Sequence, residues 1–125
     1  MWMHVNPNPK HKNVPDCVIR AICFAMDMNW YDVYDDLVEV GRMDCNMPSS
    51  DAVWGHYLQI RGCRPFLLPK RCPNCITIKD FARLYPEGTY IIGTGSHAVA
   101  IRDGDYYDSW DSGDEISSFF WKVPN

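Results

Sequence analysis

Long apolar runs, blocks of one charge and internal repeats are all missing from this chain of 125 residues. No apolar run approaches the roughly 20 residues of a membrane span, and the first residues lack the apolar core of a signal peptide. We therefore expect a cytoplasmic protein that does not contact a membrane. No Lys/Arg-rich block occurs and the formal net charge is −4, so the sequence offers no electrostatic footprint for a nucleic-acid backbone.

The composition is that of a folded globular protein. Hydrophobic residues make up 46% of the chain and aromatic residues 14%. The length fits one domain, residues 1–125, which can bury most of its apolar surface without needing disulfides or metal ions for stability. Residues 1–15 are rich in Asn, Pro and Lys, which predicts an extended arm without regular structure. Such an arm can lie across a site.

The cysteines of a chain with no export signal are expected to be free thiols, because the cytosol keeps them reduced. The spacing of Cys72 and Cys75 is that of half a zinc site, but no second such pair follows. Cys45, Cys63 and His56 could complete a site only if the fold brought them close. Structural zinc is thus the alternative to a loop with two thiols, and otherwise no cofactor is expected. The full set is Cys17, Cys23, Cys45, Cys63, Cys72 and Cys75.

The first part of the chain has the apolar periodicity of helices, and each helix follows a residue whose side chain can cap its first turn. Gly41 is expected to end the second helix and Gly62 the third. The four caps and their helices are Asp16 before a helix with apolar residues from Val18 to Met26, Asn29 before Trp30–Val40, Ser49 or Ser50 before Asp51–Arg61, and Thr77 before a helix through Leu84.

The last third has the alternation of strands. A short strand also precedes the fourth helix, and Pro65 within it argues for a sheet edge. Gly95-Ser96 and Asp103-Gly104 are tight turns between strands. Together the elements predict an α+β domain, with helices in the N-terminal half and an antiparallel C-terminal sheet. The predicted strands are Cys63–Leu68, Thr89–Thr94, His97–Arg102, Asp105–Trp110 and Ser117–Val123.

Cys17 is the predicted nucleophile because it lies in the first turn of an apolar helix. Backbone N–H groups without a partner and the positive end of the helix dipole both favour a thiolate there. The alternative is a small buried hydrophobe, as most free cysteines are. A polar loop beside Asp16 is a poor core position, which favours the nucleophile.

The Asp103-Gly104 hairpin places two further candidates together. If the turn has two residues, Arg102 pairs with Asp105 and His97 lies diagonal to Asp108 on one face of the ladder. Such a diagonal spans about 7–8 Å between backbones, within reach of a side-chain hydrogen bond. A carboxylate on one imidazole nitrogen leaves the other nitrogen to act on a thiol. The alternatives are a strand histidine bonded to backbone and a loop carboxylate.

The order of these residues resembles the papain-like cysteine proteases. Cys17 begins an N-terminal helix, Ser96-His97-Ala98-Val99 begins a strand, and Asp108-Ser109-Trp110 resembles the Asn-Ser-Trp segment of that family, with Asp in place of Asn. The resemblance implies a minimal papain-like fold in which Asp108 orients His97 and Trp110 shields their bond. The chain is also similar to small proteins of Firmicutes bacteria and their phages.

One element of the family pattern is missing. Papain-like enzymes carry a Gln five or six residues before the cysteine, and its amide helps to hold the oxyanion, whereas this chain has His11 and Lys12 there. Asn13 or Asn8 is the candidate replacement. The alternative for either residue is turn formation, which asparagine favours.

These residues predict a thiol hydrolase that cleaves a peptide, isopeptide or other amide bond of a protein or peptide substrate, with the triad Cys17, His97 and Asp108. Two other classes stay open. An acyltransferase or transglutaminase-like enzyme uses the same triad, and a non-catalytic protein-binding module could use the same scaffold. Substrate identity and oligomeric state are not encoded in any pattern of this sequence.

Overall fold

The computed structural model describes residues 1–125 as four helices packed on a six-stranded sheet, which confirms the predicted α+β class. The sheet order is β1-β5-β4-β3-β6-β2. None of the helices is both long and apolar enough to cross a membrane. The elements are β1 (Trp2–His4), α1 (Cys17–Met26), α2 (Trp30–Met43), α3 (Asp51–Ile60), β2 (Arg64–Leu67), α4 (Ile78–Leu84), β3 (Thr89–Gly93), β4 (Ala98–Arg102), β5 (Asp105–Asp108) and β6 (Phe119–Lys122).

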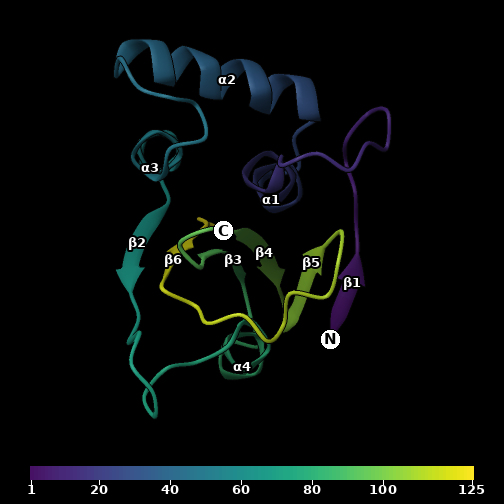
Figure 1. The fold of residues 1–125 in the computed structure, drawn as a ribbon, viewed down its shortest axis with the longest axis vertical. Helices are drawn as coiled ribbons and strands as arrows, with labels where there is room; N and C mark the ends of the chain where they lie inside the picture. Colours follow the sequence, from purple (N-terminus) through teal and green to yellow (C-terminus); the bar gives the residue numbers. More distant parts are fainter.

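The sheet lies between two layers of helices. Figure 1 shows α1, α2 and α3 on one side of it and α4 on the other. Each side has its own apolar core: Ile22 and Trp54 belong to the first, and Phe81 and Ile101 to the second. Burial of these faces is what stabilises such short helices, because isolated helices of their length are marginal in water. The N-terminal ends of α1 and β4 thereby lie next to each other.

Local caps explain where three of the helices begin. The side chain of Asn29 accepts from the Asp32 N–H, that of Ser50 from the Ala52 N–H, and Thr77 forms a capping box with Asp80. Asp16 occupies the N-cap position of α1, as predicted, but its side chain makes no capping bond. Its carboxylate instead bonds three side chains within the molecule, described below.

Two further predictions are wrong: the extended arm over residues 1–15 contains a strand, and the second helix does not end at Gly41. Residues Trp2–His4 form β1, parallel to β5, so the sheet is mixed rather than antiparallel. These residues precede the prolines of the arm, and their N–H and C=O groups pair with the otherwise open edge of β5. Helix α2 continues through Gly41, where a Cβ would lie only 2.9 Å from the Asn46 carbonyl oxygen. Gly41 therefore serves a close backbone approach rather than a helix stop.

The expectation of free thiols is wrong for one pair. Cys72 and Cys75 form a disulfide, with 4.6 Å between their Cα atoms. The tight loop brings them within the range that a disulfide spans. Cys17, Cys23, Cys45 and Cys63 are free.

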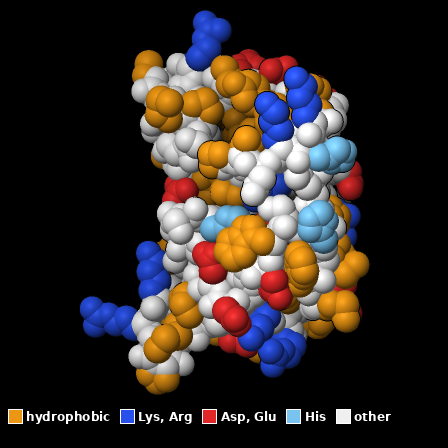
Figure 2. All heavy atoms as spheres, turned by 45° about the vertical axis from the view of Figure 1, so that its right-hand side comes forward, with side chains coloured by type: hydrophobic (Ala, Val, Ile, Leu, Met, Phe, Trp, Pro, Cys, Tyr) orange, Lys and Arg blue, Asp and Glu red, His pale blue; other side chains and the backbone are white.

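On one face of the molecule, side chains of different types gather in different places. Figure 2 shows histidine side chains across the middle of one face, among acidic and hydrophobic groups, with lysines and arginines mainly toward its ends.

Candidate active site

Cys17 is the first residue of α1, and its side chain is partly exposed beside a cavity. The N–H groups of Cys17 and Val18 donate to no acceptor within the chain. Such unpaired donors carry the positive end of the helix dipole and favour an anion at this point. The start of α1 therefore offers both a thiol and hydrogen-bond donors for negative charge.

His97 directly precedes β4, and Asp108 is the last residue of β5. The register predicted for their hairpin is present, since Arg102 pairs with Asp105 and Ile101 with Tyr106. His97 Nε2 lies 2.6 Å from Asp108 Oδ2. The sequence predicts that His97 is the first residue of this strand, whereas β4 begins one residue later, at Ala98. With Nε2 held by the carboxylate, Nδ1 is the nitrogen that remains for the thiol.

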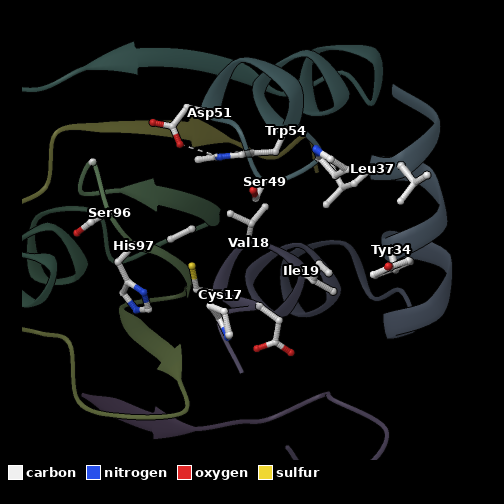
Figure 3. Close-up of a pocket in the computed structure, with 16 residues that line it drawn as sticks. Cys17, Val18, Ile19, Tyr34, Leu37, Ser49, Asp51, Trp54, Ser96 and His97 are labelled. Atoms are coloured by element: carbon white, nitrogen blue, oxygen red, sulfur yellow. Dashed lines mark hydrogen bonds between the residues drawn. The ribbon is translucent and has the colours of Figure 1, made fainter. Parts of the chain in front are cut away.

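The thiol and the imidazole are in contact. In Figure 3 the Cys17 sulfur points toward the ring of His97 from the opposite element. Burial raises the pKa of the Cys17 thiol, but hydrogen bonds from His97 and the Ala98 N–H outweigh it, and the net pKa is below the ordinary 9.0. Burial lowers the pKa of His97, but its bonds to Asp108 and Cys17 raise it to about 9. These opposite shifts favour a thiolate–imidazolium pair at neutral pH.

Asp108 is held by more than His97. Oδ2 accepts from the Ser112 hydroxyl at 2.7 Å, and Oδ1 accepts from the Ser109 N–H at 2.8 Å. Although burial raises the pKa of Asp108, its bonds to His97 and Ser112 lower it overall. A carboxylate that is only 3% exposed needs such partners, because an unpaired buried charge is costly. Asp108 is thus fixed as an anion facing His97.

A buried ion network joins Asp108 to the start of α1. Arg20 lies 3.5 Å from Asp108 Oδ1 and forms a second ion pair with Asp16. Asp16 also accepts from Trp30 Nε1 at 2.9 Å and from Asn8 Nδ2 at 3.3 Å. No apolar or catalytic pattern of the sequence predicts this role for Arg20 or Asp16. The four-residue spacing of Asp16 and Arg20 is the one signal that could have indicated their pairing.

The two predicted oxyanion asparagines do not line the cavity. Asn8 is buried, its amide donates to Asp16, and its carbonyl accepts the N–H groups of Lys10 and Lys12. Asn13 lies exposed on the arm. Asn8 therefore organises a turn of the arm, which is the alternative that the sequence had offered for it.

Trp110 lies over the imidazole. Its ring centroid is 5.0 Å from that of His97, and its side chain is 47% exposed. The indole therefore covers the outer face of His97 and limits the access of water to that side. This is the position expected of a residue that shields the bond between His97 and Asp108.

A cavity of about 530 Å³ opens beside Cys17. This volume is in the range of small-ligand pockets. Cys17, His97 and Ser96 line it from one side, and Ser49, Asp51 and Trp54 line it from α3 and the loop before it. The hydroxyls of Ser49 and Ser96 make no hydrogen bond within the chain. The sequence predicts only a capping role for Ser49 and no site role for Asp51, because the packing of α3 is what brings both residues to the cavity beside Cys17.

The residues considered for zinc are not assembled into a site. Cys72 is bonded to Cys75, Cys63 is buried, and His56 Nδ1 bonds Asp44 at 2.8 Å. No group of three or more His, Cys, Asp or Glu side chains is placed to hold a metal ion.

Comparisons with models of protein families, with curated proteins and with solved structures found no match for this chain.

Proposed function

We propose that the protein is a thiol hydrolase with a papain-like arrangement, cleaving a peptide, isopeptide or other amide bond. The observation that carries the proposal is the bonded series Cys17, His97 and Asp108 at the mouth of a cavity. Acyl transfer requires a nucleophile in contact with a base, and a carboxylate that orients the base. Here the carboxylate of Asp108 holds Nε2 of His97, which leaves Nδ1 for the thiol.

In the first half of the reaction the Cys17 thiolate attacks the carbonyl carbon, and the carbonyl π electrons move to oxygen. The tetrahedral intermediate collapses as the C–N bond breaks, and the amine leaves with the proton of the His97 imidazolium. A thioester on Cys17 remains. His97 then takes a proton from water, the resulting hydroxide equivalent attacks the thioester, and the C–S bond breaks to release the acid and restore the thiolate.

The oxyanion of both intermediates is stabilised by the start of α1. The Cys17 N–H has no hydrogen-bond acceptor within the chain, and it belongs to the same residue as the attacking sulfur. One such donor typically contributes about 10²- to 10³-fold in rate. Asp108 keeps His97 in the tautomer and orientation that face the thiol, so the charge on the imidazolium is balanced from both sides.

The test is hydrolysis of a diverse peptide mixture, with products identified by mass spectrometry. We expect cleavage by the wild type and loss of about 10²-fold or more in Cys17→Ala and His97→Ala. Cys45→Ala is the matched control, because Cys45 is free and exposed but lies outside the cavity. Acid quenching of the reaction is expected to trap an acyl group on the peptide that contains Cys17.

Other outcomes separate the other classes. If the acyl group passes only to an added primary amine and never to water, the protein is an acyltransferase. If no acyl group forms on Cys17 with any substrate, and Cys17→Ala keeps the biological effect, the protein is a binding module and the proposal is wrong.

A further inference from the structure

The cavity beside Cys17 has two chemically different ends. Figure 3 shows Leu37, Ile19 and Tyr34 on one side of Cys17, and Asp51, Ser96 and His97 on the other. The first end is apolar, since its side chains come from the facing surfaces of α1 and α2. The second end carries polar and charged groups. A substrate that spans Cys17 must therefore present different chemistry to the two ends.

The proposed reaction fixes which half of the substrate lies at which end. His97 must donate its proton to the leaving amine, so the amine half of the substrate lies on the His97 side. The acyl half then extends from Cys17 toward Leu37 and Tyr34. This assignment rests on the proposed hydrolysis.

Asp51 determines the charge at the amine end. Its Oδ1 accepts from Trp54 Nε1 at 3.0 Å, while the rest of the carboxylate is exposed at the cavity. The bond to the indole fixes the direction of this carboxylate on the first residue of α3. Asp16, the other acidic residue of the lining, is buried and paired with Arg20.

No lysine or arginine lines the cavity to balance Asp51. The charge of the His97 imidazolium is already opposed by Asp108 and by the Cys17 thiolate. The amine end is therefore an environment that attracts a cation and repels an anion.

We infer that the substrate is an amide whose acyl half bears an apolar group and whose amine half bears a cationic group, and that Asp51 is the specificity-determining residue for that cation. A lysine or arginine residue directly after the cleaved bond of a peptide has this chemistry. An acidic group in the same place is disfavoured by Asp51.

The test compares peptides that differ only in the residue after the cleaved bond, Lys, Gln or Glu, with leucine before that bond. We expect kcat/KM to be about two- to fivefold higher for Lys than for Gln, and lower again for Glu, as for a pair of partly exposed charges. Asp51→Asn keeps an acceptor for Trp54 Nε1 and is expected to abolish this order. Asp35→Asn removes the same charge from the solvated face of α2, and it is expected to leave the order of the three kcat/KM values unchanged.

A second measurement does not need turnover. Cys17 is alkylated with neutral iodoacetamide and with anionic iodoacetate, and the ratio of the two rates is determined by peptide mass spectrometry. The exposed thiol of Cys45 in the same chain serves as internal reference. Asp51→Asn is expected to raise the relative rate of iodoacetate at Cys17 about two- to fivefold, whereas Asp35→Asn is not.

The two measurements distinguish the inference from the proposed function. If peptides are cleaved without preference for Lys, or if Asp51→Asn keeps the preference, the inference is wrong and the hydrolase stands. If no peptide is cleaved but Asp51→Asn changes the alkylation ratio, the hydrolase fails and the charge selection by Asp51 stands. An unchanged ratio without cleavage overturns both.

Discussion

Arg20 is the cation that makes the buried carboxylates of the site compatible with the fold. It is only 7% exposed and lies between Asp16 and Asp108, which are also buried. Without Arg20, two anions would share a region that water cannot reach. Both ends of this network touch the site. Asp108 bonds His97, and Asp16 directly precedes Cys17 in the chain. Arg20 is a positioning residue and does not face the cavity.

Arg20→Gln is expected to lower the free energy of unfolding by about 3–5 kcal/mol, because it leaves buried charges without their partner. Urea denaturation at neutral pH measures this loss. Arg83→Gln is the matched control, since Arg83 also pairs with an aspartate, Asp80, but its side chain is 75% exposed. The control is expected to change stability by less than about 1 kcal/mol. Equal effects of the two substitutions would contradict the network.

At the scale of elements, the position of His97 depends on how closely β3, β4 and β6 pack. Gly93 ends β3 and is paired with Ala98 in β4 and with Phe119 in β6. The Phe119 ring covers Gly93, so that an added Cβ would lie 2.1 Å from the Phe119 Cζ atom. Ala98 follows His97 directly, and its N–H bonds the Cys17 sulfur. A shift of the backbone at Gly93 is therefore expected to move His97 relative to Cys17.

Gly93→Ala is expected to destabilise the protein by about 1–3 kcal/mol, the usual cost of overpacking. Denaturant unfolding measures it. The double variant Gly93→Ala with Phe119→Leu should be less destabilised than the sum of the two single variants, because the smaller side chain relieves the contact. Strict additivity of the two losses would show that the Phe119 ring is not the cause.

At the scale of the whole molecule, the sequence predicted the parts of the fold that local chemistry determines. The helix that begins at Cys17, the cap at Asn29 and the Asp103-Gly104 turn all depend on residues close in the chain. The hairpin turn even predicted the contact between His97 and Asp108, because a two-residue turn fixes the register of both strands.

Other features could not be predicted, because they depend on tertiary packing. The strand Trp2–His4 exists because β5 presents an open edge, and no local pattern encodes that partner. Asp16 is at the predicted N-cap position, but its carboxylate bonds Arg20 and Trp30, which only the packing of α1 against α2 and β5 explains. Asp51 reaches the cavity for the same reason, since α3 packs against α2.

The central claim is that His97 and Asp108 activate Cys17, and the pH dependence of its alkylation by iodoacetamide tests this most directly. Since the pKa of Cys17 is lowered and that of His97 is raised to about 9, the thiolate of Cys17 forms at a lower pH than that of an ordinary cysteine. We expect the rate at Cys17 to be already high at pH 7, where an ordinary thiol, with a pKa of about 8.5, is mostly protonated and reacts slowly. His97→Ala should move the pH profile of the Cys17 rate up toward that of an ordinary thiol. A Cys17 rate that rises only near pH 8.5 in the wild type, and is unaffected by His97→Ala, would contradict the account.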